Sequence, residues 1–329
     1  MFCFLSVIRY RTVIFLNEKF CFSEGIKHEK TKNILKIIPH KTLHKKSVNF
    51  VSAFFRGGGK HLEAGAFFTT FIGTIAFNSV SSAIYIINDI KDRKQDSMHP
   101  TKRKRPIASG DVSVQEAKII SLLLLLLTGG LLYAAKAEGA ACFCCVIYLF
   151  INLAYSFGLK NVPILDITLL GAGYLIRVLF GGFLAGIPVS AWLFLTVLCV
   201  SFYLGFGKRK GELEGCMDRG DNAASLESKV CQQIVMRPVL EKYTLSYLDN
   251  HMNLCLGLGV VFYSLWAMEK SIILVYTVPL VLFICMKYDL VLTEKADGDP
   301  VNTIFASKSL LILLVLYIGI IAFILYILL

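Results

Sequence analysis

Acidic and amide side chains at the end of a long apolar run are the residues of this sequence best suited to chemistry. Asn88, Asp92 and Asp96 are spaced at i, i+4 and i+8, and Asp89 lies three residues before Asp92, so a helix would present all four on one face. Oxygen ligands grouped in this way suit Mg²⁺ held through a bound phosphate. The alternative is a charged helix end in water, but such ends rarely follow an apolar run as directly as here, after Phe67 to Ile87.

A basic loop follows these residues. Residues 99–110 contain two prolines and a glycine, which predicts a shaped loop rather than a continued helix. Lys102 and Arg105 in this loop could hold phosphate oxygens, and arginine can do so with two parallel hydrogen bonds. Taken alone, the positive charge could simply mark the end of a membrane span. Next to four side chains with oxygen ligands that suit a metal ion, it favours a site for Mg²⁺ and a diphosphate.

A second polar group surrounds Asp166, a carboxylate just inside a later apolar stretch. A charge at this depth should face the interior of a helix bundle and have a partner. Lys160, in the segment that begins with Tyr155, is one candidate partner, and a second metal ion or a sugar hydroxyl is another. Arg177, deeper in the same stretch, also needs an anion. A purely structural ion pair within the membrane is the alternative interpretation.

Two further charged groups lie nearer the C-terminus. In 207–214, Lys208 and Glu212 are four residues apart and a second Lys–Glu pair repeats this spacing, which would also suit ordinary ion pairs on a solvated helix face. The acidic residues, glycine and proline of 294–300 predict a turn that could act as a lid. Their spacing lacks the pattern of an EF-hand, which argues against calcium.

The composition indicates an integral membrane protein. Of the 329 residues, 56% are hydrophobic and only 17% are charged, and long apolar runs recur from Phe67 to the C-terminus. These runs lack the short alternating pattern of membrane barrel strands. We therefore predict an all-α, polytopic membrane bundle of about nine transmembrane helices. The expected spans are near 64–87, 117–136, 139–157, 164–186, 190–206, 252–268, 271–288 and 308–329, and the shorter segment 47–59 would be a ninth span or a re-entrant piece.

The distribution of charge predicts how this bundle is oriented. We expect a basic segment, 1–37, in the cytosol or at the membrane surface, followed by one membrane domain, 38–329. With nine crossings and a cytosolic N-terminus, nearly all loop lysines and arginines fall on the cytosolic side, as the positive-inside rule requires. The polar groups then share that side and can converge on one cavity between helix ends. The net charge of +11 could also suit nucleic acid, but no nucleic-acid-binding signature is present, so such a partner is not expected.

The acidic residues and the basic loop together resemble the first aspartate-rich motif of the UbiA prenyltransferase superfamily. The matching pattern is Asn88-Asp89-x-x-Asp92-x-x-x-Asp96, followed by His99-Pro100-x-Lys102-x-x-Arg105-Pro106-Ile107-Ala108-Ser109-Gly110. Other segments are similar to one branch, the decaprenyl-phosphate phosphoribosyltransferases. These segments are Tyr155-Ser156-x-x-Leu159-Lys160 with Asp166, Gly207-Lys208-Arg209-x-x-Glu212-Leu213, Arg237-Pro238-Val239-Leu240 with Tyr243, and Glu294-Lys295 through Gly298-Asp299-Pro300.

The resemblance implies transfer of 5-phosphoribose from phosphoribosyl diphosphate to a polyprenyl phosphate, with diphosphate as the leaving group. It implies Mg²⁺ bound by Asp89, Asp92 and Asp96, and catalytic roles for Asp89, Asp92 and Asp166. Asp166 would stabilise charge that develops at the sugar carbon or position ribose hydroxyls. The implied substrate-binding residues are Asn88, Asp96, Lys102, Arg105, Tyr155, Lys160, Arg177, Lys208, Arg209 and Glu212.

The resemblance also implies a cellular setting. This is the inner (cell) membrane of a bacterium, with the active-site loops in the cytosol and a role in cell-envelope biosynthesis. The polyprenyl chain would lie among membrane lipid in an apolar groove between helices. Association of identical chains into an oligomer is compatible with these features.

Two other functions stay open from the sequence. The first is prenyl transfer from a polyprenyl diphosphate to an aromatic or other acceptor, which would use the same acidic residues. Asp166 has Leu170 four residues later rather than a second carboxylate, and this favours phosphoribosyl transfer. The second is a transporter or lipid-binding membrane protein, which would show no turnover and no dependence on the acidic residues.

Overall fold

The computed structural model describes residues 64–98, 102–221, 238–294 and 300–324, and every regular element among them is helical. In chain order these elements are α5 (Ala64–Met98), η2 (Lys102–Lys104), α6 (Pro106–Ser109), α7 (Val114–Ala134), α8 (Gly139–Ser156), η3 (Leu159–Asn161), α9 (Leu165–Ala185), α10 (Ala191–Asp221), η4 (Pro238–Lys242), α12 (Leu245–Lys270), α13 (Ile272–Val275), α14 (Val278–Glu294), α15 (Pro300–Ala306) and α16 (Lys308–Phe323). The basic segment 1–37, the short segment 47–59 and most of the expected turn at 294–300 lie outside the described residues.

Within the described residues, 7 helical stretches are long and apolar enough to cross a membrane, and α16 is a shorter apolar helix. Together they coincide with the eight expected spans that begin at residue 64 or later, which confirms the polytopic helical bundle. The expected count of about nine is approximate, because the ninth segment lies outside the described part of the chain. Leu122, Leu123 and Leu126 on α7 are 58%, 58% and 65% exposed, as suits side chains that face lipid.

Two helices extend beyond the expected spans and carry polar motifs. α5 runs unbroken from the apolar residues through Met98, so Asn88, Asp92 and Asp96 do lie on one helix. α10 likewise continues past residue 206, through 207–214, to Asp221. The polar motifs therefore stand on extensions of the same helices that form the bundle, which fixes their direction.

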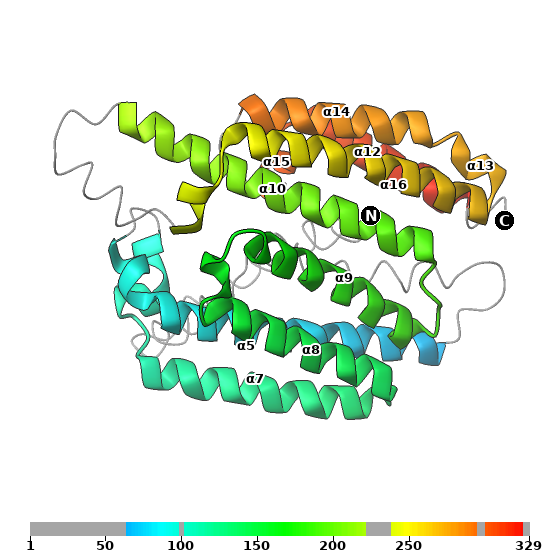
Figure 1. The fold of residues 1–329 in the computed structure, drawn as a ribbon. Helices are drawn as coiled ribbons and strands as arrows, with labels where there is room; N and C mark the ends of the chain where they lie inside the picture. The colour runs from blue at the N-terminus through cyan, green and yellow to red at the C-terminus, as the bar shows by residue number, and fades with distance from the viewer. Residues whose placement is uncertain (1–63, 99–101, 222–237, 295–299, 325–329) are drawn as a thin grey trace, which may run out of the picture.

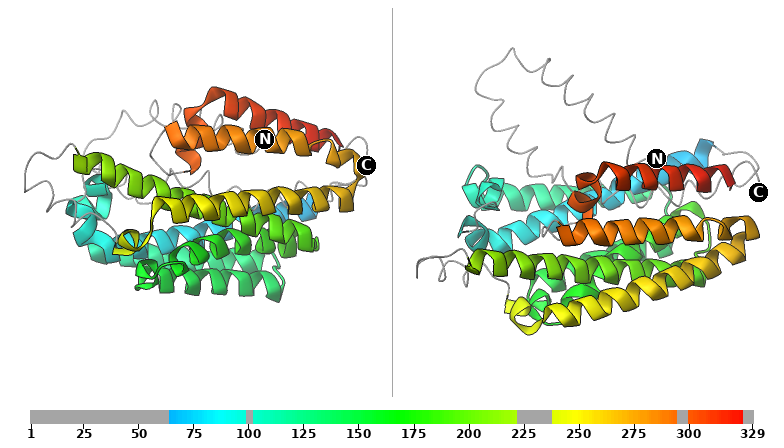
Figure 2. Two further views of the ribbon diagram at one scale, coloured as in Figure 1. Left: turned by 45° about the horizontal axis from the view of Figure 1, so that its top comes forward. Right: turned by 90° about the horizontal axis from the view of Figure 1, so that it is seen from above.

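The long helices lie side by side, and the polar motifs gather at one end of the bundle (Figure 1). α5 packs against α7, α8 and α9, α10 packs against α9 and α12, and α14 contacts both α12 and α16. The end of α5, η2 with α6, the turn that holds η3, the last turns of α10, and η4 all lie at the left in Figure 1. The views in Figure 2 show the same grouping. The polar groups thus share one end of the bundle, as expected from the sequence.

A glycine permits α9 and α10 to approach closely near this polar end. A Cβ atom on Gly205 would lie 2.8 Å from Ile167 Cγ2, a separation that real Cβ atoms do not show. Asp166 precedes Ile167, and Arg209 lies one helical turn after Gly205. The close approach therefore brings a carboxylate of α9 within reach of a guanidinium of α10.

Candidate active site

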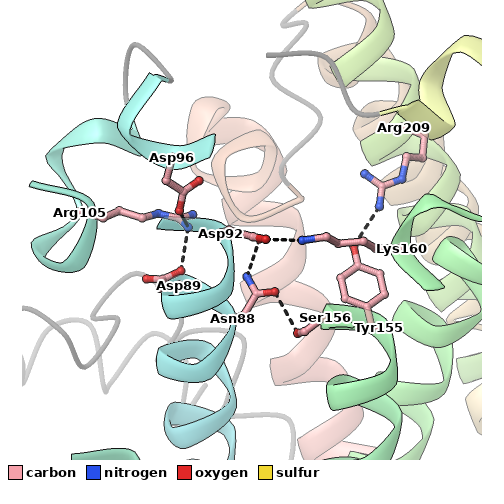
Figure 3. Close-up of polar contacts among 9 residues, drawn as sticks. All are labelled: Asn88, Asp89, Asp92, Asp96, Arg105, Tyr155, Ser156, Lys160 and Arg209. Carbon is pink, nitrogen blue, oxygen red and sulfur yellow. Dashed lines mark hydrogen bonds and ion pairs between the residues drawn. The ribbon is translucent and has the colours of Figure 1, made fainter. Parts of the chain in front are cut away.

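Arg105 bridges two carboxylates of α5. Its Nη1 donates to Asp89 Oδ1 and to Asp96 Oδ2, each at 2.8 Å (Figure 3). The Asp96 side chain is only 6% exposed, whereas that of Arg105 is 39% exposed. We call the four side chains of Asn88, Asp89, Asp92 and Asp96 the acidic face. Arg105 covers part of this face and remains accessible itself.

Apolar contacts hold the basic loop against α5. Ile107 is 1% exposed and packs with Ile86, Val112 and Ala117 in a small core of its own. Gly110 ends α6 in the left-handed conformation, with φ of 88°, which lets the chain turn toward α7. Because Arg105 lies two residues before the buried Ile107, this packing directs the guanidinium toward the acidic face.

The end of α8 and the turn after it supply the other contacts to the acidic face. Ser156 Oγ donates to Asn88 Oδ1 at 2.9 Å, and Asn88 Nδ2 donates to Asp92 Oδ2 at 3.2 Å. Lys160 Nζ donates to Asp92 Oδ1 at 2.5 Å (Figure 3). Gly158, with φ of 143°, makes the turn that folds Lys160 back toward α5. Both oxygens of Asp92 therefore accept a hydrogen bond.

A second cluster forms around Arg209. Its Nε donates to Asp166 Oδ2 and its Nη1 to Glu212 Oε2, both at 2.5 Å, and its Nη2 donates to Tyr155 Oη at 3.2 Å. The side chains of Arg209 and Asp166 are 0% exposed, and that of Glu212 is 25% exposed. A buried ion pair is tolerated where further hydrogen bonds support it, and here each of the three guanidinium nitrogens has a partner. Glu212 is the carboxylate of this cluster that a ligand could reach.

Tyr243 completes the second cluster from the segment that leads into α12. Its hydroxyl donates to Asp166 Oδ1 at 2.7 Å and accepts the Ile164 backbone N–H at 2.7 Å. Burial raises the pKa of Tyr243 above its usual value, and the hydrogen bond to Asp166 raises it further, so the hydroxyl stays a donor. Ile164 has φ of 69°, which for a β-branched residue costs of the order of 1–3 kcal/mol.

The two clusters meet at the last turn of α8. Tyr155 contacts Arg209, while the next residue, Ser156, contacts Asn88. In Figure 3, Tyr155 and Lys160 lie between the acidic face and Arg209. Polar groups from α5, α8, the turn at η3 and α10 thus form one continuous set. The residues that the structure joins in this way are Asn88, Asp89, Asp92, Asp96, Arg105, Tyr155, Ser156, Lys160, Asp166, Arg209, Glu212 and Tyr243.

One suggested pairing from the sequence is wrong. Lys160 was a candidate partner of Asp166, but it pairs with Asp92, and Asp166 pairs with Arg209. The reason is the close approach of α9 and α10 at Gly205, which periodicity along one helix does not reveal. Two other candidates lie beside the clusters, since Lys102 belongs to the same loop as Arg105 and Lys208 directly precedes Arg209.

Arg177 lies apart from both clusters. It is 4% exposed and donates to Tyr148 Oη at 2.5 Å and to Ser81 Oγ at 3.3 Å. Its guanidinium also lies over the Phe77 and Tyr148 rings, at 5.4 and 5.2 Å from their centroids. Ser81 precedes Asn88 by seven residues on α5, so Arg177 lies about 10 Å along the helix from the acidic face.

Ser156 and Tyr243 join the site without having been predicted as site residues. Ser156 could have been found, because it follows Tyr155 and the α8 helix ends there. Tyr243 belongs to a segment on which the family resemblance rests, but its contact with Asp166 spans 77 residues of sequence, so residue spacing does not reveal it.

The acidic face fits Mg²⁺ by the chemistry of its donors. Carboxylate oxygens are hard ligands, and Arg105 already places positive charge between Asp89 and Asp96. Within the described residues, no three His, Cys, Asp or Glu side chains are arranged to hold one metal ion together. In this arrangement, Arg105 pairs with Asp89 and Asp96, and Lys160 pairs with Asp92.

Comparison with known proteins finds a family with this architecture. The model of the UbiA prenyltransferase family matches residues 48–311. The chain is 34% identical over 201 residues to the decaprenyl-phosphate phosphoribosyltransferase of Corynebacterium glutamicum, covering 61% of this chain and 56% of that protein. It is 36% identical over 200 residues to the protein of the same name from Mycolicibacterium smegmatis, covering 61% and 58%. The match therefore spans less than two thirds of either relative.

Solved structures show the same fold. A digeranylgeranylglyceryl phosphate synthase superposes with a TM-score of 0.62 at 20% identity, covering 89% of this chain and 99% of that one. A UbiA homolog from Archaeoglobus fulgidus bound to DMAPP and Mg²⁺ superposes with a TM-score of 0.61 at 15% identity, covering 89% and 98%.

Proposed function

Because this chain belongs to the UbiA prenyltransferase family, we propose that it is a membrane-embedded transferase of the phosphoribosyl branch. It transfers 5-phosphoribose from phosphoribosyl diphosphate to the phosphate of a polyprenyl phosphate such as decaprenyl phosphate, and diphosphate leaves. The proposal extends to this chain the reaction class named for its bacterial relatives.

The observation that carries the proposal is the pairing of Lys160 with Asp92. In the branch pattern, the second motif contributes a lysine and one aspartate where other superfamily members have two aspartates. Here that lysine reaches the acidic face, and the aspartate, Asp166, is fully buried against Arg209 and Tyr243. The site thus has one cluster of carboxylates, the acidic face, which suits one metal-bound diphosphate. Its lysine and arginine side chains suit further phosphates. Phosphoribosyl diphosphate and polyprenyl phosphate together carry two phosphates more than a diphosphate alone.

Each residue then has a defined task. Asp89, Asp92 and Asp96 would hold Mg²⁺, which when bound neutralises the charge of the leaving diphosphate. Lys102, Arg105, Lys160 and Lys208 hold phosphate oxygens, and Asn88 orients the diphosphate. Glu212, with its partly exposed carboxylate, faces the ribose.

The acceptor needs no strong general base. A phosphate oxygen of the polyprenyl phosphate is already anionic, and it bonds to the anomeric carbon as the bond from that carbon to the diphosphate oxygen breaks. Charge that develops at the sugar ring is stabilised by carboxylates placed beforehand. Asp166 contributes by orienting Arg209, because neither of its oxygens is free to face the sugar.

The site lies on the cytosolic face of a bacterial inner membrane. The water-soluble donor enters from the cytosol, where basic loops attract it, and the polyprenyl chain stays among lipid between the helices. The product serves cell-envelope biosynthesis.

Membranes that contain the protein test the reaction directly. They are incubated with phosphoribosyl diphosphate labelled in the ribose, Mg²⁺ and decaprenyl phosphate, and the lipid extract is counted. Labelled lipid that depends on decaprenyl phosphate is the expected result. No labelled lipid, together with transfer from a polyprenyl diphosphate to an aromatic acid, would replace this proposal by prenyl transfer.

A further inference from the structure

The Tyr243 hydroxyl joins two elements that meet at the second cluster. It accepts the Ile164 N–H and donates to Asp166 Oδ1, so one oxygen atom connects the residue before α9 with a carboxylate in the first turn of α9. Ile164 and Asp166 come from the same turn of the chain, whereas Tyr243 comes from beyond α10. The phenol therefore fixes how α9 begins relative to the segment that precedes α12.

Tyr243 is itself held rigidly. Val239 and Leu240, in η4, are 0% and 2% exposed and anchor the segment in the core. The Tyr243 ring is 6% exposed and stacks on Tyr247, with ring centroids 5.8 Å apart. A side chain that is buried and stacked in this way can hold the group that it contacts in one position.

The Ile164 backbone depends on this contact. Its φ of 69° is unusual for a β-branched residue, and the residue next to it, Pro163, has no N–H of its own. The Ile164 N–H points at Tyr243, while the Asp166 N–H bonds to Val162 O at 3.1 Å. Loss of the phenol oxygen would leave the Ile164 N–H without this acceptor.

The same contact reaches the substrate side of the cluster through Arg209. Asp166 Oδ2 accepts from Arg209 Nε, and the other nitrogens of that guanidinium hold Glu212 and Tyr155. Tyr155 lies next to Ser156, which contacts the acidic face. A shift of Asp166 would therefore move Arg209. It would also move Glu212, the side chain that we place against the ribose.

We infer that Tyr243 is a positioning residue of the transferase, which sets the orientation of the Asp166–Arg209 pair and thereby of Glu212 and Tyr155. The expected effect of Tyr243 on the rate of transfer rests on the proposed function. The expected effect of Tyr243 on the Ile164 N–H does not depend on which reaction the protein catalyses.

The variant Tyr243→Phe removes only the hydroxyl oxygen, and Tyr247→Phe is its matched control. Tyr247 is partly buried one turn further along, and its hydroxyl has no hydrogen bond among the described residues. Thermal unfolding of both variants in detergent establishes that they fold.

Hydrogen exchange followed by mass spectrometry gives the first readout, which needs no activity. In a peptide that covers residues 162–168, we expect Tyr243→Phe to speed exchange by about one amide, and Tyr247→Phe to leave it unchanged. Unchanged exchange in Tyr243→Phe would overturn the inference, whatever reaction the protein performs.

Steady-state kinetics with the labelled donor give the second readout. We expect Tyr243→Phe to lower kcat roughly 10- to 100-fold, with a smaller change in KM for phosphoribosyl diphosphate. Because Tyr243 acts through Asp166, the double variant with Asp166→Asn should be no slower than Asp166→Asn alone. Independent, multiplying effects in the double variant, or wild-type kcat in Tyr243→Phe, would overturn the inference. An inactive wild-type protein would instead overturn the proposed function and leave the exchange result to decide the role of Tyr243.

Discussion

Arg105 and Asp96 form an ion pair that closes the basic loop onto α5, with Nη1 and Oδ2 2.8 Å apart. The same nitrogen binds Asp89, so a cation of the protein lies where the proposed function places a metal ion. A metal ion and Arg105 must then compete for the carboxylates of Asp89 and Asp96. A bound diphosphate would remove this competition by forming hydrogen bonds with Arg105 itself. This predicts that metal and diphosphate favour each other's binding.

The variant Arg105→Gln tests this coupling. Without a ligand, it should bind Mn²⁺ more tightly, because the competing cation is gone. With diphosphate present, it should bind Mn²⁺ more weakly, because a phosphate contact is lost, and each change should be roughly fivefold or more. Free Mn²⁺ is measured by electron paramagnetic resonance during titration. Arg103→Gln, an exposed neighbour in η2, is the control. Shifts in the same direction with and without diphosphate would contradict the competition.

The variant Asp92→Asn should abolish most of the transfer activity while the protein still inserts and folds. Asp92 accepts from Lys160 and Asn88 and is a proposed metal ligand, so loss of its charge should lower kcat/KM roughly 100-fold or more. Asp111→Asn changes an exposed carboxylate just after the basic loop and should keep wild-type activity. Full activity of Asp92→Asn in the labelled-lipid assay would remove Asp92 from the metal site.

The buried pair of Asp166 and Arg209 predicts a large effect on stability. Asp166→Ala leaves a fully buried guanidinium with Glu212 as its remaining carboxylate, which should cost about 3–5 kcal/mol of unfolding free energy. Asp249→Ala breaks a pair with Lys210 in which the carboxylate is 45% exposed, and it should cost less than about 1 kcal/mol. Denaturation in mixed micelles compares the two variants. Equal losses would contradict the burial of the first pair.

Arg177 should act on stability rather than on substrate affinity. Arg177→Met removes hydrogen bonds to Tyr148 and Ser81 and the contacts with two rings, at a cost of about 2 kcal/mol or more. Arg177→Lys keeps the charge but not the planar contact, so it should recover only part of this loss. KM for phosphoribosyl diphosphate is measured alongside thermal unfolding. A raised KM with unchanged stability would return Arg177 to the substrate-binding residues suggested by the sequence.

The sequence correctly predicted those features of the site that depend on spacing within a single helix. The spacing of Asn88, Asp92 and Asp96 placed them on one face, and α5 carries them so. The long apolar runs likewise predicted the spans, because length and hydrophobicity are local properties. Charge in the loops predicted that the polar groups share one end of the bundle, since each crossing reverses the side.

The part that sequence reasoning missed depends on contacts between helices. Lys208 and Glu212 have the spacing of an ion pair, but spacing alone does not reveal that Glu212 pairs with Arg209, which also contacts Asp166 of α9. The rotation of α10 about its axis is set by Gly205 against Ile167, which no spacing within α10 reveals. The contact between Tyr243 and Asp166 depends on how α9 and the segment before α12 are placed relative to each other, which is a property of the whole fold.

The last turn of α8 serves two clusters with two consecutive residues. Tyr155 and Ser156 point about 100° apart around the helix axis, one toward Arg209 and the other toward Asn88. Insertion or deletion of a single residue within α8 would rotate both away from their partners at once, even with every polar residue retained. The number of residues in α8 is therefore a determinant of the site in its own right, and homologous sequences that differ in that number would need a different arrangement of polar partners.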